Sequence, residues 1–204
     1  MERRKSVHAP KQSEIIGVGG IGKSVGCTHF SIMLVNYLAG YQRETCVLLE
    51  WNQTGDLEKM ELVCTGKQKE KKPYRVLEVD YYKQSGTKEL TDVMKLRYQN
   101  IVIDFGDIRD MSYPDFLRCD RQFLIGSFSE WREESFREFV RVHNAGRKNW
   151  IYLAAFGSEE TRREFRKRPG IMVCRIPFSA DAFVVTEETG KFFRKLMKSQ
   201  NRNH

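Results

Sequence analysis

A glycine-rich loop between an apolar run and a helical pattern constrains this chain more than any other feature. Residues 14–29 read EIIGVGGIGKSVGCTH, so closely spaced glycines follow a short apolar run. Glycine lets the backbone turn tightly enough for successive N–H groups to converge on an anion, and a helix N-terminus favours negative charge. The segment therefore predicts a strand, a phosphate-binding loop and a helix, in that order.

The loop fits the phosphate-binding signature in two registers. In the literal register, Gly17–Ser24 satisfies G-x-x-x-x-G-K-[ST], which places Lys23 on the β- and γ-phosphates and Ser24 on Mg²⁺. This register leaves little strand before Gly17. It also puts Gly26 in the first turn of the helix, where glycine costs about 1 kcal/mol relative to alanine.

The second register, which we favour, extends the strand through Gly19 and the loop over Gly20–Gly26. The signature then ends Gly26-Cys27-Thr28, so Cys27 stands at the lysine position while Thr28 keeps a hydroxyl for Mg²⁺. A glycine-rich turn that binds no ligand is the alternative to both registers, because short motifs often match without function.

Length and composition predict one domain. A chain of 204 residues with 40% hydrophobic residues can bury one good core and is too short for two comfortable domains. We expect a basic flexible tail over residues 1–12 and a single domain over residues 13–204. The apolar runs fall below the roughly 18 residues of a membrane span, and the N-terminal segment lacks the apolar core of a signal peptide. A cytoplasmic protein is expected.

The five cysteines are odd in number and scattered, with no C-x-x-C pair that would indicate zinc or dithiol chemistry. Cys27 differs from the others because a thiol at a helix N-terminus can have a lowered pKa. A catalytic or redox thiol would need a base, and His29 is the nearby candidate. This hypothesis competes with a capping or packing role for Cys27.

Most of the net charge of +8 lies at the two ends of the chain. Residues 1–12 carry four basic side chains against one acidic one, and residues 187–204 carry five against two. A nearly balanced body with basic ends suits weak, nonspecific contact with DNA or with an anionic membrane to which the protein is peripheral. Solvated tails that keep the protein soluble are the alternative.

Strand-like runs alternate with helical patterns along the rest of the chain. The expected strands are Thr45–Trp51, Tyr74–Tyr82, Asn100–Phe105, Gln122–Ser127, Trp150–Phe156 and Ile171–Phe178, and the expected helices are Thr28–Tyr41, Thr87–Tyr98, Glu130–Val142 and a C-terminal helix from about Glu187. This alternation predicts an α/β fold, with a mostly parallel sheet, helices on both faces and a ligand at the carboxyl ends of the strands.

Two of these helices carry apolar stripes. Trp131, Phe136, Phe139 and Val140 form a stripe that we expect in the core. In the C-terminal helix, Phe192, Phe193, Leu196 and Met197 lie beside basic residues, a pattern also typical of helices on anionic membranes. We expect this helix to pack on the sheet, because an apolar stripe is first of all a core face.

Polar residues end two of the predicted strands. Asp104 closes an apolar run and precedes Gly106, as expected where a carboxylate meets Mg²⁺ directly or through water. Glu50 and Asn52 end the strand after the first helix. They could position a water or a metal. The same residues could instead cap a helix formed by the segment Gly55–Leu62.

The order of phosphate loop, VLLEWNQTGDL, NIVIDFG, FLIGS and RIPF resembles the MinD/ParA branch of the SIMIBI class of P-loop ATPases. This branch includes the divergent members associated with Tad-type pilus and secretion loci. The resemblance covers most of residues 14–198. It implies ATP or ADP with Mg²⁺, a homodimer, and a partner in a secretion, pilus or partition system. The implied site residues are Thr28 and Asp104 for Mg²⁺, Gly20, Gly22 and Gly26 for the anion, and Pro177 for the base.

The chain departs from the family's hallmark loop, K-G-G-x-G-K-[ST]. Neither register supplies both lysines, and Asn52 stands where the family has a carboxylate near the attacking water. Because single cationic groups can be worth about 10³–10⁵ in phosphoryl-transfer rate, turnover should be near background. Backbone N–H groups would still favour an anion. We therefore expect a nucleotide-binding or pseudo-ATPase scaffold, with an active partition-type ATPase that uses Lys23 and binds DNA nonspecifically as the alternative.

Overall fold

A single eight-stranded sheet organises the chain. The computed structural model describes residues 13–67, 73–108, 113–143, 150–167 and 172–198. Its strands are β1 (Glu14–Gly20), β2 (Cys46–Glu50), β3 (Tyr74–Val76), β4 (Val79–Tyr82), β5 (Asn100–Asp107), β6 (Arg121–Gly126), β7 (Trp150–Ala154) and β8 (Val173–Arg175). Their spatial order is β3-β4-β2-β5-β1-β6-β7-β8, and every pairing is parallel except β3 with β4. The predicted α/β class is confirmed.

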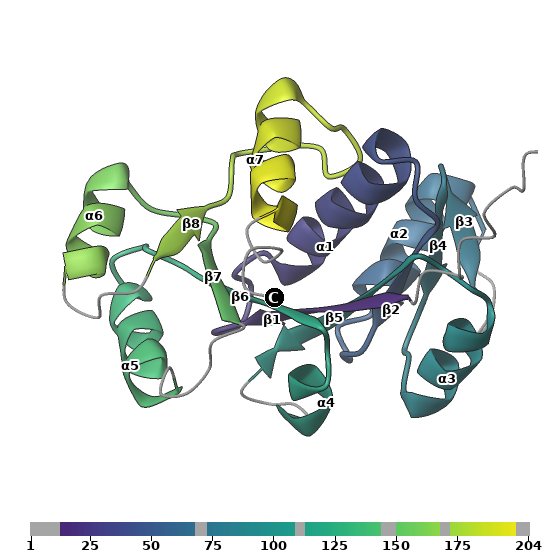
Figure 1. The fold of residues 1–204 in the computed structure, drawn as a ribbon, viewed down its shortest axis with the longest axis horizontal. Coiled ribbons are helices and arrows are strands. Elements are labelled where there is room, and N and C mark those ends of the chain that lie inside the picture. Colours follow the sequence, from purple (N-terminus) through teal and green to yellow (C-terminus); the bar gives the residue numbers. More distant parts are fainter. Residues whose placement is uncertain (1–12, 68–72, 109–112, 144–149, 168–171, 199–204) are drawn as a thin grey trace, which may run out of the picture.

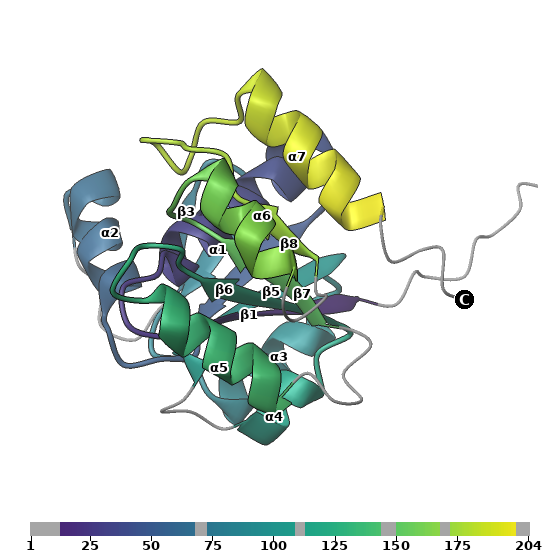
Figure 2. The ribbon, with the colours of Figure 1, turned by 90° about the vertical axis from the view of Figure 1, so that its left-hand side faces the viewer.

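Helices cover both faces of this sheet. They are α1 (Cys27–Asn36, continued by a π-helical turn over Tyr37–Tyr41), α2 (Asp56–Thr65), α3 (Thr87–Lys95), α4 (Tyr113–Leu117), α5 (Glu133–His143), α6 (Glu159–Lys167) and α7 (Glu187–Lys198). Figure 1 shows α1, α2 and α7 above the sheet and α3 and α4 below it. Figure 2, turned by 90°, shows α5 on the same side as α3 and α4.

The C-terminal helix packs on the sheet as predicted. Phe193 and Leu196 are buried in the core between α1 and the sheet. The ring centroid of Phe193 lies 5.6 Å from that of Phe30 in α1 and 5.2 Å from that of Tyr37. Since burial of these two side chains supplies hydrophobic stabilisation of the helix, this part of its apolar stripe belongs to the core.

Glycines let helices approach the other face of the sheet closely. A Cβ added to Gly17 of β1 would lie 2.9 Å from the Cys119 sulfur and 3.0 Å from the Phe116 ring. In β6, a Cβ on Gly126 would lie 2.5 Å from the ring of Phe136 in α5. The glycines of β1 therefore serve helix packing as well as the loop that follows.

The structure corrects two expectations about elements and adds two helices. Tyr74–Tyr82 is not one strand but an antiparallel hairpin, because the backbone turns at Leu77, whose φ is +53°. Trp131 is not in the core: α5 begins at Glu133, and the Trp131 side chain is 78% exposed. The short helix α4 and the highly charged α6 were not predicted, since neither has a long apolar stripe.

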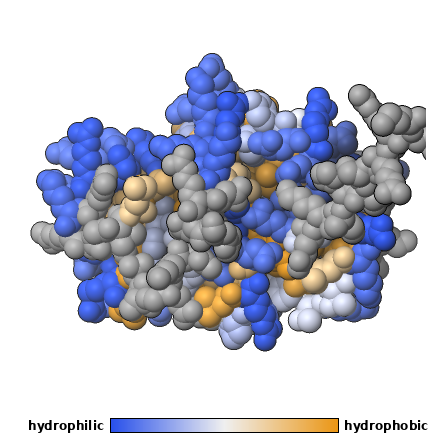
Figure 3. Space-filling view, viewed as in Figure 1, coloured by the Kyte–Doolittle hydropathy of each residue, from blue (hydrophilic) through white to orange (hydrophobic). Residues whose placement is uncertain are grey.

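Hydrophilic residues dominate the coloured surface of the view in Figure 3, where apolar residues form small separate patches. Within the described ranges, no helix has the length and apolar character needed to cross a bilayer. The basic tail predicted for residues 1–12 lies outside the described residues, as does Arg202 among the basic residues of the C-terminal end.

Candidate functional site

The glycine-rich loop leaves the centre of the sheet. β1 lies between β5 and β6, ends at Gly20, and is followed by α1 from Cys27. The intervening turn needs left-handed backbone at three positions, with φ of +124° at Gly22, +56° at Ser24 and +97° at Gly26. These bounds lie within one residue of those of the favoured register, whose strand runs through Gly19, whereas the literal register leaves little strand before Gly17.

The first turn of α1 has features that favour an anion. Its N-cap is Gly26, which offers no side-chain hydrogen bond, and the turn contains no acidic residue. The first N–H groups of a helix have no partner inside the helix, so they attract negative charge. The loop is also tight, because a Cβ on Gly20 would lie 2.6 Å from the Cys27 sulfur.

Thr28 and Asp104 meet beside this turn, as the predicted magnesium pair requires. The Thr28 hydroxyl donates a hydrogen bond of 2.6 Å to the Asp104 carboxylate, and the Gly106 N–H donates one of 3.0 Å to its other oxygen. A hydroxyl and a carboxylate at the end of a strand are hard oxygen ligands of the type that Mg²⁺ prefers. Ser24, the hydroxyl of the literal register, is exposed in the loop.

The electrostatics of the pair also suit a cation. Burial raises the pKa of Asp104 to about 6, against the lowering effect of the hydrogen bonds from Thr28 and Gly106. The nearby carboxylates Glu50 and Asp56 raise it further. Because a bound divalent cation favours the ionised carboxylate, Mg²⁺ would relieve this unfavourable burial of charge. The residues present therefore fit a magnesium ion bound with a phosphate.

Cys27 is a buried, neutral thiol at the lysine position of the favoured register. Burial raises its pKa well above the ordinary value, and Asp104 and Asp107 raise it further. Its sulfur lies 3.7 Å from the Gly106 carbonyl. The contact that the structure gives His29 is with the Ser179 carbonyl, at 2.9 Å from its Nε2. The raised pKa is opposite to the lowered one that the hypothesis of a reactive thiol requires.

Glu50 holds loops together in this structure. Its carboxylate is fully buried and accepts hydrogen bonds from the N–H groups of Leu57, at 3.1 Å, and Gln84, at 3.3 Å. Leu57 belongs to the helix that follows β2, and Gln84 to the connection that follows β4. The capping role that the sequence left open for Glu50 is thus present, because Leu57 lies in the first turn of α2.

Asn52 also has both ends of its side chain engaged. Its amide nitrogen donates to the Asp104 carbonyl at 3.0 Å, and its oxygen accepts from the N–H and the hydroxyl of Thr54 at 3.0 and 2.7 Å. This turn places Asn52 beside Gly106, where a Cβ would lie 3.0 Å from the Asn52 Cβ. Asn52 therefore lies next to the Thr28–Asp104 pair.

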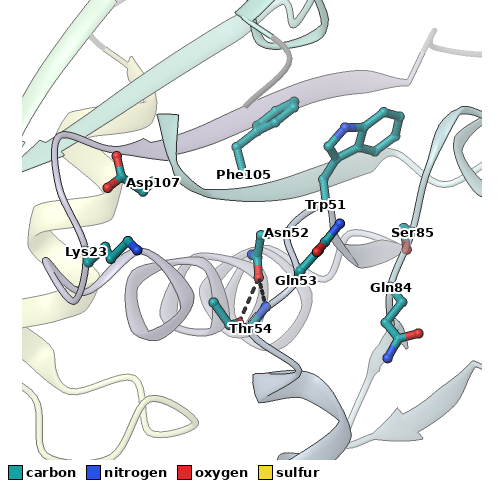
Figure 4. Close-up of a pocket in the computed structure, with 9 residues that line it drawn as sticks. All are labelled: Lys23, Trp51, Asn52, Gln53, Thr54, Gln84, Ser85, Phe105 and Asp107. Atoms are coloured by element: carbon teal, nitrogen blue, oxygen red, sulfur yellow. Dashed lines mark hydrogen bonds between the residues drawn. The ribbon is translucent and has the colours of Figure 1, made fainter. Parts of the chain in front are cut away.

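A cavity of about 1030 Å³ opens beside the loop. Its lining consists of Lys23, Trp51, Asn52, Gln53, Thr54, Gln84, Ser85, Phe105 and Asp107. Figure 4 shows Lys23 and Asp107 at one end of the cavity and Gln84 and Ser85 at the other. Asp107 was not predicted, although it follows Gly106 in the same strand-end motif as Asp104.

Pro177 lies in the connection between β8 and α7. The start of this connection still pairs with β7, because the Ile176 N–H donates to the Ala154 carbonyl at 2.9 Å. The contact between His29 and Ser179 brings it to the first turn of α1. The segment that contains Pro177 thus lies beside the phosphate loop, and the side chain of Phe178 is 87% exposed there.

No protein-family model and no curated protein matches the sequence. Solved structures do match. The MinD cell division protein of Aquifex aeolicus has a TM-score of 0.66 and 12% identity over 91% of this chain and 97% of its own. MinD of Pyrococcus horikoshii complexed with Mg-ADP has a TM-score of 0.61 and 13% identity over 90% and 94%.

A third match is a putative plasmid partition protein of Borrelia burgdorferi bound to AMPPNP, with a TM-score of 0.61 and 16% identity over 92% of this chain and 97% of its own. At such low identities the likeness concerns the fold. The chain has the MinD/ParA-like P-loop NTPase fold, in agreement with the resemblance found in the sequence.

Proposed function

We propose that this chain is a MinD/ParA-like scaffold that binds ATP or ADP with Mg²⁺ and hydrolyses it little or not at all. The observation that carries the proposal is a contrast at the start of α1. The Thr28–Asp104 pair and the uncapped first turn offer groups for Mg²⁺ and phosphate, whereas Cys27 offers a neutral thiol at the lysine position. Binding needs the first set, and fast phosphoryl transfer needs the missing charge.

The scaffold acts as a homodimer in this proposal. Three large aromatic side chains are exposed after the ends of neighbouring strands, with Trp131 following β6, Phe156 following β7 and Phe178 following β8. Exposed aromatic residues gathered at one edge are typical of interfaces. A dimer formed over this edge would bury them together with the nucleotide sites.

The partner of the dimer is proposed to be a component of a secretion, pilus or partition assembly. The structural match to a plasmid partition protein and the basic ends of the sequence support this class of partner. In the same proposal, the protein is cytoplasmic, and the basic ends add weak contact with DNA or with an anionic membrane surface.

Calorimetric titration of the chain and of Thr28→Val with MgATP tests the binding proposal. Valine keeps the shape of threonine but removes the hydroxyl, so we expect a loss of affinity of about tenfold or more. Thr91→Val is the matched control, because Thr91 is exposed on α3 and its hydroxyl donates to the Thr87 carbonyl of the same helix. Equal affinities for the chain and Thr28→Val, or no binding by the chain itself, would refute the proposal.

An active partition-type ATPase is the second candidate, and the position of Lys23 favours it. Lys23 is exposed, lines the cavity beside the loop and forms no ion pair with any residue that the structure describes. If Lys23 supplies the catalytic cation, Lys23→Ala abolishes phosphate release while Lys88→Ala on α3 does not. In the scaffold proposal, neither variant changes a rate that is already near background.

A further inference from the structure

Arg132 reaches the phosphate loop from a different part of the chain. It lies in the connection between β6 and α5, where its backbone N–H donates to the Ser129 carbonyl at 2.9 Å. Its guanidinium Nη1 donates a hydrogen bond to the backbone carbonyl of Lys23, 109 residues earlier. Because β6 is the neighbour of β1, this connection and the loop leave the same edge of the sheet (Figure 1).

The charge on Arg132 is not neutralised by a carboxylate within the described ranges. A guanidinium has five N–H donors and stays charged at any pH that a protein tolerates, and one donor is engaged at Lys23. The described residues offer the other donors no hydrogen-bond partner. Guanidinium groups bind phosphate well, because two of their parallel N–H groups match two phosphate oxygens.

The site needs such a cation. Asp104, Asp107 and Glu50 place negative charge around the start of α1, and the thiol of Cys27 supplies none to offset it. The Lys23 side chain lines the cavity on the β2 and β5 side of the loop, whereas Arg132 approaches from the β6 side. A polyphosphate in the loop would therefore lack a cation on the β6 side without Arg132.

We infer that Arg132 is the phosphate-binding cation of this site, supplied by the β6–α5 connection in place of the missing loop lysine. The inference deepens the proposed function and rests on it. It assigns to the site a ligand class, polyphosphate anions with or without a nucleoside, because the guanidinium lies at the loop that would hold the phosphates. Sequence patterns give no sign of this role, since Arg132 lies far from the glycine motif in the chain.

Three variants separate the charge of Arg132 from its contact with the loop. Arg132→Gln keeps an N–H donor for the Lys23 carbonyl but removes the charge, and Arg132→Lys keeps the charge. Arg163→Gln is the control, because Arg163 is an exposed arginine whose nearest ion pair, with Glu159, is long at 3.9 Å. Thermal unfolding without ligand shows whether each variant is folded as stably as the original chain.

The probes are MgATP and inorganic triphosphate, each titrated calorimetrically. We expect Arg132→Gln to bind both about tenfold or more weakly, Arg132→Lys to recover part of that loss, and Arg163→Gln to match the original chain. Unchanged affinity in Arg132→Gln would overturn the inference and leave the proposed function standing. A wild-type chain that binds neither probe would overturn both, so the two failures are distinguishable.

Discussion

The Thr28 hydroxyl donates a 2.6 Å hydrogen bond to the Asp104 carboxylate, which joins the first turn of α1 to the end of β5. The two residues are 76 positions apart, and the parallel register of β1 with β5 brings them together. This contact places a hydroxyl and a carboxylate beside uncapped backbone N–H groups. The groups that we propose for Mg²⁺ and phosphate are therefore brought together by the fold.

Burial of Asp104 predicts a dependence of stability on pH. Its pKa is raised to about 6 in the folded chain, from about 3.9 when unfolded. Between these pH values the folded chain retains a proton on Asp104 that the unfolded chain has lost. The contribution of Asp104 to the free energy of unfolding is therefore fully present below about pH 4 and is lost as the pH rises through 6. The free energy of unfolding of the wild type, minus that of Asp104→Asn, should fall by about 1–3 kcal/mol between about pH 4 and pH 7.5.

Denaturant unfolding at several pH values measures this difference, with Asp92→Asn as the control. Asp92 is exposed, and its hydrogen bond with Lys95 lowers its pKa. Its contribution to the free energy of unfolding therefore changes only below the range from about pH 4 to pH 7.5. The Asp104→Asn difference should slope downward while the Asp92→Asn difference stays flat. A flat difference for Asp104→Asn would show that the carboxyl is not desolvated.

Gly126→Ala should destabilise the chain by about 1–3 kcal/mol, because overpacking forces buried neighbours out of position. The added Cβ would lie 2.5 Å from ring atoms of Phe136. That ring is fully buried and stacks on Phe165 with centroids 4.8 Å apart. Gly40→Ala is the control, since a Cβ there meets nothing within 4 Å. Thermal unfolding should show Gly40→Ala equal to or more stable than the wild type, and the same result for Gly126→Ala would contradict the packing.

Cys27 should resist alkylation in the native chain. Its thiol is buried and its pKa is raised by burial and by Asp104 and Asp107, so little thiolate is present at neutral pH. Cys64 on α2 is exposed and should react first. Mass spectrometry after limited iodoacetamide treatment identifies the modified residue. Faster modification of Cys27 than of Cys64 would restore the hypothesis of an activated thiol.

Local patterns predicted the fold well where they were long and periodic. The run that ends at Asp104 and the apolar stripe of α7 each indicated an element that the structure contains. The hairpin turn at Leu77 was missed, because nothing in the residue type announces a positive φ there. Trp131 was assigned to the core because the helical spacing of apolar residues extends to Trp131, which precedes the first residue of α5.

The candidate site was predictable only as far as its motifs are local. The glycines and the hydroxyl of Thr28 lie in one short segment, and the ends of β2 and β5 identified Glu50, Asn52 and Asp104. Burial raises the pKa of Cys27, and the charges of Asp104 and Asp107 on β5 raise it further. The contact of Arg132 with the loop depends on β6 lying beside β1. Such features come from tertiary packing, which a pattern along the chain does not contain.

The central proposal is that this loop binds a nucleoside triphosphate without hydrolysing it. The most direct measurement incubates the purified chain with MgATP for hours, separates bound from free nucleotide by gel filtration, and identifies the bound fraction by chromatography. We predict that ATP is recovered intact with the protein, and that Thr28→Val retains little of it. Recovery of ADP with steady phosphate release, or of no nucleotide at all, would contradict the claim.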